Sequence, residues 1–141
     1  MRVAEAFVLD TSAFLTLTEE EEGVDVVKAR IAAAVEGTVE LHASFVSLTE
    51  VEYISVQEKG QAVADVRLAD MRALPIRWHH TDDAMCSAAA KFKAAHKLSF
   101  ADSFVVALAQ KLDATLIHKD PEIEALGPVV KQEMLPPKTG T

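Results

Sequence analysis

Residues 99–120 read SFADSFVVALAQKLDATLIHKD, and this stretch shows how the chain is organised. Ser99 is a residue type that often caps a helix, and Asp102 follows three residues later, which is the spacing of a capping box. The apolar stretch ATLIH, at 114–118, predicts a buried strand. Asp120 then precedes Pro121, a pair typical of the first residues of a short helix. The segment therefore predicts a helix, a strand and a second helix in succession.

The same alternation of strands and helices continues through the rest of the chain. Further short strands are expected at 6–10 (AFVLD), 39–44 (VELHAS) and 76–80 (IRWHH), with a last edge strand at 128–133 (PVVKQE). Apolar spacing and Gly or Pro stop signals predict the other helices at 24–37, 45–60, 61–74 and 84–97. Alternating strands and helices form parallel sheets that are covered on both faces. We therefore expect an α/β fold with a central, mainly parallel sheet of four to five strands.

The connections between these elements are short and polar. DTS, at 10–12, predicts a turn after the first strand. The acidic run at 19–23 predicts a solvated turn or the acidic first turn of the next helix. Thr81 is expected to cap the helix at 84–97, with Asp82 and Asp83 in its first turn. No internal linker or repeat interrupts the pattern, so one domain is expected.

Length and composition indicate a globular, intracellular protein. The chain has 141 residues, of which 50% are hydrophobic and 26% are charged, as in a single folded domain. Its one cysteine, Cys86, excludes a disulfide framework and a cysteine-rich zinc site. Glu5 and Asp10 interrupt the apolar stretch that a signal peptide would need, and no apolar run reaches the about 20 residues of a membrane span. We expect a cytoplasmic location and no contact with a membrane.

The net charge of −8 limits how the protein could bind nucleic acid. A module that grips phosphates directly normally has a basic face. An enzyme that reaches phosphates through bound cations does not need one, because metal reverses the local sign of an acidic site. The same charge could also attract a basic partner protein. The charge leaves both of these classes open.

Four acidic residues are expected to approach one edge of the sheet. Asp10 directly follows the first strand, and Asp120 follows the strand at 114–118 after one intervening residue, so both lie where functional crevices form in such folds. Asp102 opens a helix, and Glu50 lies on the helix at 45–60. Each acid alone also has an ordinary explanation as a cap or a surface residue. Together, such carboxylates repel one another unless a cation neutralises them, and their oxygens suit Mg²⁺ or Mn²⁺ better than zinc.

The chain contains the segments VLDTSAFL at 8–15, SLTEVEYI at 47–54, and KLSFADSFVVALAQKLDATLIHKDPEIEAL at 97–126. These three segments resemble the successive motifs of a known family, the PIN domain. The likeness extends from residue 6 to about 135, and it is greatest to the VapC-like ribonuclease toxins of toxin–antitoxin pairs. The resemblance implies a PIN-like α/β/α sandwich, with a nuclease domain at 1–135 and a flexible C-terminal tail at 136–141.

The resemblance also implies roles for individual residues. The four acids match the family's acidic quartet, which holds Mg²⁺ or Mn²⁺; Glu52 is the rival of Glu50 for its place. Ser12 matches a small polar residue that supports the first Asp, and Glu122 lies where some members have a further acid. His118 stands where many relatives have Thr or Ser, so it could contact a phosphate together with Lys119 or have a plain surface role. The pair His79–His80 is expected to end a strand without binding anything. The quartet consists of Asp10, Glu50, Asp102 and Asp120.

The implied function is metal-dependent endoribonuclease activity, with RNA cleaved by metal-activated water. The VapC-like likeness further implies a homodimer, and an antitoxin whose basic segment occupies the acidic crevice. Two alternatives stay open: an RNA-processing PIN nuclease without an antitoxin, and a catalytically silent PIN-like module that only binds a partner. A receiver-type phosphoacceptor would need adjacent acids after its first strand, and a flavodoxin-like binder would need a Gly-rich loop where this chain has DTSAF.

Overall fold

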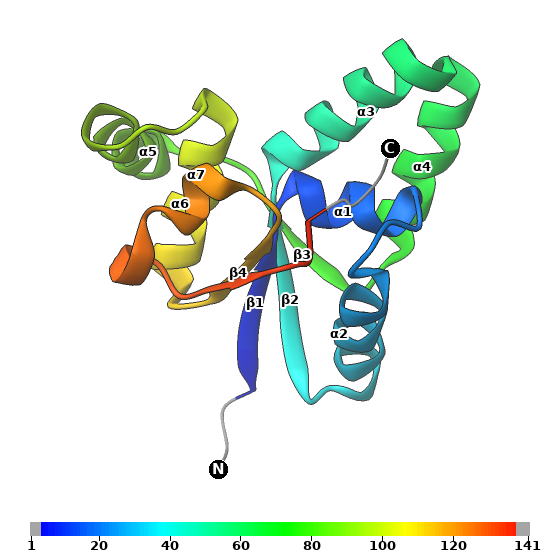
Figure 1. The fold of residues 1–141 in the computed structure, drawn as a ribbon, viewed down its shortest axis with the longest axis horizontal. Coiled ribbons are helices and arrows are strands. Elements are labelled where there is room, and N and C mark those ends of the chain that lie inside the picture. Colours follow the sequence, from blue (N-terminus) through cyan, green and yellow to red (C-terminus); the bar gives the residue numbers. More distant parts are fainter. Residues whose placement is uncertain (1–3, 138–141) are drawn as a thin grey trace.

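A computed structural model of the protein describes residues 4–137, and its centre is a five-stranded parallel sheet (Figure 1). The strands lie in the order β3-β2-β1-β4-β5, and every neighbouring pair is parallel. The predicted α/β fold with a mainly parallel sheet of four to five strands is confirmed. The strands are β1 (Glu5–Leu9), β2 (Val39–Ser44), β3 (Ile76–His79), β4 (Thr115–His118) and β5 (Gln132–Met134).

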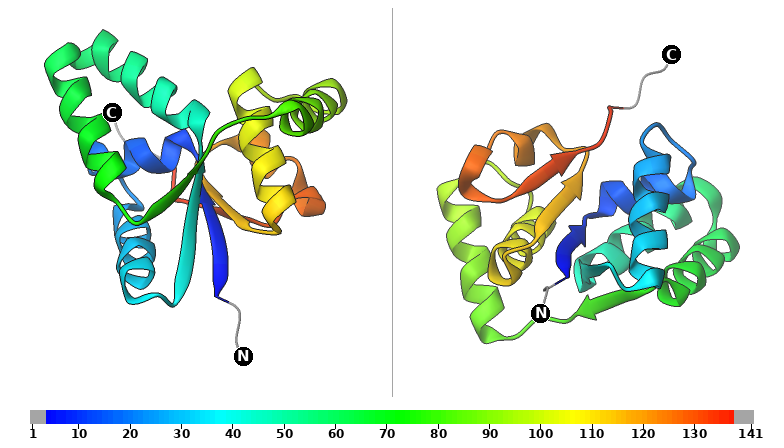
Figure 2. Two further views of the ribbon diagram at one scale, coloured as in Figure 1. Left: turned by 180° about the vertical axis from the view of Figure 1, so that it is seen from behind. Right: turned by 90° about the horizontal axis from the view of Figure 1, so that it is seen from below.

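Helices cover both faces of this sheet, which gives the three predicted layers (Figures 1 and 2). One face carries α1 (Thr11–Thr18), α2 (Val24–Glu36), α3 (Phe45–Lys59) and α4 (Gln61–Ala73), and α3 and α4 pack against each other as a hairpin. The other face carries α5 (Asp83–Ala95), α6 (Phe100–Leu112) and the short α7 (Pro121–Glu124). None of the helices among residues 4–137 has both the length and the apolar character needed to cross a bilayer.

The central strand β1 separates two hydrophobic cores. Phe7 and Leu9 belong to the core under α1 to α4, whereas Val8 belongs to the core under α5 to α7. All three side chains are buried, as expected for a strand of a parallel sheet that is covered on both faces. Because β1 lies in the middle of the sheet, its carboxyl end lies in the middle of the sheet's edge.

The sequence prediction missed one helix, α1, which begins directly after β1 where we expected only a turn. Its sequence, TSAFLTLT, has no charged residue and three β-branched threonines, so its local helix signal is weak. Packing compensates for the weak helix propensity, because Phe14 is fully buried and stacks on Trp78, with 5.4 Å between the ring centroids. The acidic run at 19–23 forms the turn between α1 and α2, as one of its two interpretations proposed.

Three other boundaries differ from the sequence prediction. Asp82, not Thr81, caps α5, because its carboxylate accepts the backbone N–H of Met85 at 2.8 Å. The same helix ends at Ala95 rather than near 97. The last strand occupies 132–134, since a 3₁₀ turn at Gly127–Val129 uses the first part of the predicted strand at 128–133.

The C-terminal end of the described chain packs against the loop before α2. Leu135 is buried, and the Cα of Gly23 lies so close to it that an added Cβ would stand 3.2 Å from Leu135 Cβ. Gly23 also has a φ of +92°, a conformation that favours glycine. Residues 138–141 of the predicted tail lie outside the described residues, and the domain limits at 1–135 stay a prediction.

Replacing Phe14 by Ala should lower the free energy of unfolding by about 3–5 kcal/mol, because a fully buried aromatic ring is removed from under α1. Val35→Ala on α2 is the control, since that side chain is 72% exposed and its loss should cost less than about 0.5 kcal/mol. Urea unfolding followed by circular dichroism measures both. Equal, small losses for the two variants would mean that α1 is not anchored by Phe14.

Candidate active site

Asp10 occupies the point where the central strand becomes a helix. Its backbone N–H donates to the carbonyl of Ile117 on β4 at 3.2 Å. Its carboxylate caps α1, because Oδ1 accepts the backbone N–H of Ala13 at 2.9 Å and the hydroxyl of Ser12 at 2.6 Å. The residue is only 3% exposed. The capping role that the sequence allowed is therefore present, and it places a buried carboxylate at the edge of the sheet.

Ser12 joins the ends of the two central strands. Its hydroxyl donates to Asp10 Oδ1 and accepts the backbone N–H of Lys119 at 2.9 Å, just beyond β4. One side chain thus holds the β1–α1 junction against the segment that leads to Asp120. The supporting role of Ser12 stays a prediction, and its hydrogen bond to Asp10 is the contact through which that role would be exerted.

Glu50 approaches the same place from α3 and is held there by α1. The hydroxyl of Thr11 donates to Glu50 Oε1 at 2.6 Å and lies 3.1 Å from the hydroxyl of Ser47. Glu52, the rival position, is exposed and accepts a long hydrogen bond of 3.4 Å from Gln61. The sequence interpretation missed Thr11 and Ser47. Their positions gave a weak signal, since Thr11 follows Asp10 directly and Ser47 precedes Glu50 by almost one helical turn.

The other two acids lie at the starts of helices on the opposite side of the sheet. Ser99 caps α6 as predicted, its hydroxyl accepting the backbone N–H of Asp102 at 3.1 Å. Asp120 caps α7, its carboxylate accepting the backbone N–H of Glu122 at 2.8 Å. The carboxyl groups of Asp102 and Asp120 are themselves close enough to share a hydrogen bond.

The pKa values show that the four acids form one electrostatic group. Burial raises the pKa of Asp10 from 3.8 to about 7; hydrogen bonds from Ser12 and Ala13 oppose this rise, and the charges of Asp120 and Glu50 add to it. The pKa of Asp102 is raised as well. Burial is the largest cause, and the carboxyl of Asp120 and the charge of Asp10 raise it further. Burial and mutual repulsion thus keep protons on the site near neutral pH.

This donor set fits a hard divalent cation. Within residues 4–137, no three His, Cys, Asp or Glu side chains are already arranged around a point that could hold a metal ion. The chemistry of the group nevertheless favours one, because it is composed of carboxylate oxygens, the ligands that Mg²⁺ and Mn²⁺ prefer. A cation would also favour the ionised forms of Asp10 and Asp102, whose pKa values are raised by burial first and by the neighbouring acids second.

His118 does not lie where the sequence interpretation placed it. It is fully buried, so both a surface role and a phosphate contact for this side chain are wrong. Its Nδ1 accepts the backbone N–H of Asp120 at 2.9 Å, and its Nε2 lies 2.8 Å from Gln132 Oε1. Burial lowers its pKa. The side chain points into the core because it shares a face of β4 with Leu116.

The paired histidines end β3, as predicted. His79 is the last residue of the strand, and its Nε2 lies 2.8 Å from His42 Nδ1. His80 follows and is exposed.

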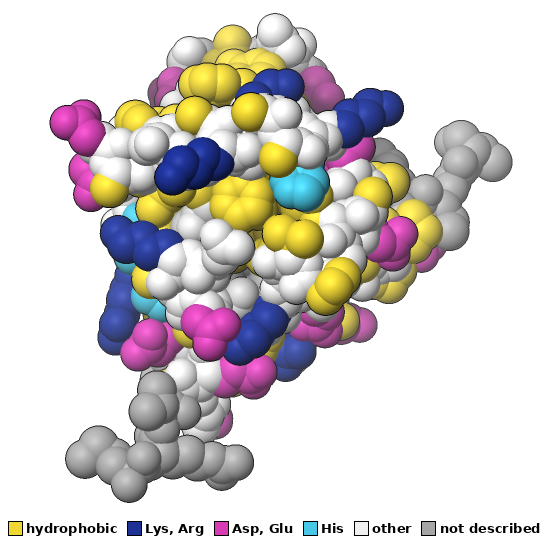
Figure 3. Space-filling view, turned by 90° about the vertical axis from the view of Figure 1, so that its left-hand side faces the viewer, with side chains coloured by type: hydrophobic (Ala, Val, Ile, Leu, Met, Phe, Trp, Pro, Cys, Tyr) yellow, Lys and Arg dark blue, Asp and Glu magenta, His cyan; other side chains and the backbone are white. Residues whose placement is uncertain are grey.

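Phe100, the first residue of α6, is 71% exposed, although its ring packs edge-on against the buried Phe104 at a centroid distance of 5.3 Å. Phe100 lines an apolar hollow between α5 and α6 together with Ala89, Ala90 and Phe104. Figure 3 shows hydrophobic side chains on the side of the molecule that carries α5, among scattered Lys and Arg side chains.

The fold and the site together define a class of protein: a three-layer α/β domain that gathers four acids at the carboxyl edge of a parallel sheet. The sequence model of the PIN domain matches residues 7–127, and the chain belongs to the PIN domain family. The resemblance found in the sequence is confirmed at the level of the family. No curated protein matches the chain significantly by sequence.

Solved structures of VapBC proteins share this fold. VapBC2 from Rickettsia felis, solved with a DNA fragment from its promoter, superposes with a TM-score of 0.75 at 12% identity, covering 93% of this chain and 99% of that chain. VapC20 from Mycobacterium tuberculosis, described as a Sarcin-Ricin loop cleaving toxin, gives 0.69 at 18% identity, covering 86% and 95%. DNA-bound VapBC from Salmonella typhimurium gives 0.66 at 15% identity, covering 94% and 98%. At these identities the likeness concerns the fold.

The raised pKa of Asp10 predicts how stability changes with pH in metal-free buffer. The folded state holds a proton that the unfolded state loses near pH 3.8, so the free energy of unfolding should fall as pH rises from there through about 7. Asp10→Asn should flatten this fall and be at least as stable as the wild type at pH 8, because the amide keeps the cap but not the charge. Adding Mn²⁺ at pH 8 should restore stability to the wild type, since the cation binds ionised carboxylates.

Asp10→Ala is the matched control, because it removes the cap together with the charge. Loss of the cap alone costs about 0.5–2 kcal/mol, so this variant should be less stable than Asp10→Asn at every pH. Urea titrations from pH 4 to pH 8 compare the three proteins. If the stability of the Asn variant fell between pH 4 and pH 8 as steeply as that of the wild type, the charge of Asp10 would not be the source of the pH dependence.

Proposed function

We propose that this protein is a Mg²⁺- or Mn²⁺-dependent endoribonuclease. The observation that carries the proposal is the group of four carboxylates at the carboxyl edge of the sheet, two of which have raised pKa values. Membership of the PIN domain family supports it. The structural likeness to a toxin described as cleaving the Sarcin-Ricin loop supports RNA as the class of substrate.

In this proposal, Asp10, Asp102 and Asp120 hold the cation. When bound, the cation polarises the phosphodiester and makes water a better nucleophile. Ser12 and the backbone N–H of Ala13 keep Asp10 in one orientation, so its carboxylate does not have to reorganise when the cation arrives. Glu122 is a candidate for a further acid of the site. Its backbone N–H donates a hydrogen bond to the carboxylate of Asp120.

Glu50 is the group that orients the attacking water. The hydroxyl of Thr11 donates a hydrogen bond to Oε1 of Glu50. The second carboxylate oxygen can accept a proton from water, because Glu50 lies at the half-exposed edge of the site. The water attacks phosphorus in line with the departing 3′ oxygen, and that oxygen takes a proton from solvent water as its bond to phosphorus breaks. The products are then a 5′ phosphate and a 3′ hydroxyl.

The experiment is cleavage of a mixed cellular RNA pool by the purified protein with Mg²⁺, with Mn²⁺ and with EDTA. Glu50→Gln should lower the cleavage rate by at least about 100-fold, the contribution typical of a general base. Glu52→Gln makes the same chemical change two residues away on an exposed side chain and should keep the wild-type rate. Asp10→Asn should be inactive although folded.

No cleavage by folded wild-type protein with either metal would contradict the nuclease and favour the catalytically silent partner-binding module. Equal losses in the Glu50 and Glu52 variants would contradict the assignment of Glu50. Mapping the cut sites would show whether transfer RNA, a ribosomal loop or messenger RNA is the substrate.

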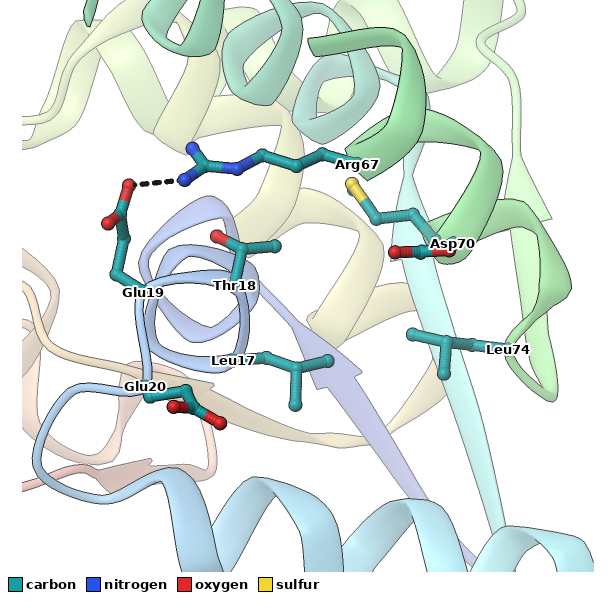
Figure 4. Close-up of a pocket in the computed structure, with 8 residues that line it drawn as sticks. Leu17, Thr18, Glu19, Glu20, Arg67, Asp70 and Leu74 are labelled. Carbon is teal, nitrogen blue, oxygen red and sulfur yellow. Dashed lines mark hydrogen bonds and ion pairs between the residues drawn. The ribbon is translucent and has the colours of Figure 1, made fainter. Parts of the chain in front are cut away.

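We also propose that an antitoxin with a basic segment binds this protein. Several of the structures with this fold are toxin–antitoxin complexes, such as one from Klebsiella pneumoniae. Beside α1 and α4 the surface has a hollow of about 450 Å³ with apolar walls from Leu17, Met71 and Leu74 (Figure 4). Glu20 and Asp70 add acidic groups to it, and Arg67 crosses it to pair with Glu19 at 2.8 Å. Apolar walls with an acidic rim suit a basic, amphipathic segment, so we assign an antitoxin contact to this hollow in addition to the acidic crevice that the resemblance implied.

Charge reversal tests this partner. The double variant Glu20→Lys/Asp70→Lys should bind the protein encoded by the neighbouring gene at least about tenfold more weakly, because like charges now meet across the interface. Glu36→Lys/Glu58→Lys carries the same change in net charge on exposed residues outside the hollow, and it should bind normally. Calorimetric titration of the purified proteins gives both affinities. Equal affinities would place the partner elsewhere.

The predicted homodimer is part of the same proposal. The apolar surface of α5 and α6, with Phe100 at its edge, is the face that we assign to the second copy. Sedimentation of the purified protein measures the state of association. A monomer at every concentration would remove the homodimer from the proposal.

A further inference from the structure

A continuous chain of hydrogen bonds runs beneath Asp120. Gln132, on the edge strand β5, donates from Nε2 to the carbonyl of Gly127 at 2.9 Å. Its Oε1 lies 2.8 Å from His118 Nε2, and His118 Nδ1 accepts the backbone N–H of Asp120 at 2.9 Å. Three side-chain and backbone contacts therefore connect the end of the sheet with one of the four acids.

The two ends of this chain fix the direction of every bond in it. The Gly127 carbonyl can only accept, so the amide nitrogen of Gln132 faces it and the amide oxygen faces His118. That oxygen can only accept, so His118 carries its proton on Nε2. The bare Nδ1 then matches the backbone N–H of Asp120, which can only donate. Only the neutral Nε2–H tautomer of His118 satisfies all of these partners at once.

Burial makes a proton on Nδ1 of His118 costly. His118 is fully buried between β4 and the hydrophobic core that includes Ile123 of α7. A proton on Nδ1 would point at the N–H of Asp120, and both groups would lose their partner away from water. The carboxylate of Asp120 is held as well, because it accepts the backbone N–H of Glu122 at 2.8 Å. The backbone and the side chain of Asp120 are thus both restrained.

We propose that His118 and Gln132 are positioning residues, which hold Asp120 at the orientation in which its carboxylate faces Asp102. The consequence for metal binding and cleavage rests on the proposed function; the restraint itself does not. The strand β5, which closes the edge of the sheet, thereby acts on the site through two side chains that touch neither cation nor substrate.

Four variants separate positioning from simple packing. His118→Asn keeps an acceptor, because Oδ1 of Asn and Nδ1 of His are both bonded to Cγ. His118→Leu fills a similar space without an acceptor. Gln132→Met keeps the length of the side chain and removes the partner of His118 Nε2. His42→Leu is the control, since His42 is also a buried strand histidine with a histidine partner, at 2.8 Å, outside the acidic group.

Nuclear magnetic resonance of ¹⁵N-labelled, metal-free protein tests the restraint. We expect His118 in the Nε2–H form and slow hydrogen exchange at the amide of Asp120. His118→Leu and Gln132→Met should speed this exchange at least tenfold more than they speed exchange in the central strands, and His118→Asn should restore most of the protection. His118 in the Nδ1–H form, or unchanged exchange in both variants, would overturn the proposal.

Calorimetric titration with Mn²⁺ and RNA cleavage then test the consequence. Loss of a partner that orients a metal ligand typically weakens metal binding by about 10–100-fold, so we expect a loss of this size in His118→Leu, partial recovery in His118→Asn and none of it in His42→Leu. The loss in cleavage should fall on kcat, with KM for RNA unchanged. Equal losses in the His118 and His42 variants would reduce the role to packing. If the wild type neither binds Mn²⁺ nor cleaves RNA, the proposed function fails, while the exchange data still decide whether the restraint exists.

Discussion

The burial of Asp10 is the constraint on which the rest of the site depends. A carboxylate that is only 3% exposed at the end of the central strand is costly unless its oxygens are satisfied, and here Ser12 and Ala13 satisfy one of them. The same hydroxyl of Ser12 accepts the backbone N–H of Lys119. The side chain that stabilises the buried carboxylate of Asp10 therefore also holds the segment that leads to Asp120. The other acids are arranged around a group that the fold has already made rigid, and their charges in turn raise its pKa.

Helix capping and the acidic site are two uses of the same carboxylates. Asp10 and Asp120 each cap a helix, α1 and α7, and Asp102 lies in the first turn of α6. Three helix N-termini therefore point their partial positive charge at the group, which partly offsets the repulsion among the carboxylates. Glu50 is the exception, because it lies within α3 and relies on the hydroxyl of Thr11 instead. The ordinary explanation as a helix cap was correct for Asp10 and Asp120, and it is compatible with a shared site.

The sequence predicted those features that are local, and it missed those that depend on contacts between distant segments. Strand positions, most helices and the strand-end position of Asp10 and Asp120 followed from apolar spacing and stop signals. The helix α1 did not, because burial of Phe14 against Trp78 replaces the missing propensity. Thr11 and Glu50 are 39 residues apart in sequence, so no pattern could reveal their bond. His118 stood at a strand end, and its burial depends on two features: it shares a face of β4 with Leu116, and the core over that face continues to Ile123 of α7.

The charges around the site explain how an acidic protein can have RNA as its proposed substrate. Lys119, the basic residue next to Asp120, is only 9% exposed, and its ammonium group lies 3.4 Å from the carboxylate of Glu21. Its charge therefore stabilises the loop before α2 instead of meeting a phosphate. With four carboxylates beside it, the edge of the sheet repels an RNA backbone until a cation reverses the local sign. In the proposed enzyme, a cation held by Asp10, Asp102 and Asp120 would therefore offset the negative charge at this edge of the sheet, and it would also supply the activation of water that the reaction needs. With such a cation, direct phosphate binding by basic side chains is unnecessary, which agrees with a net charge of −8.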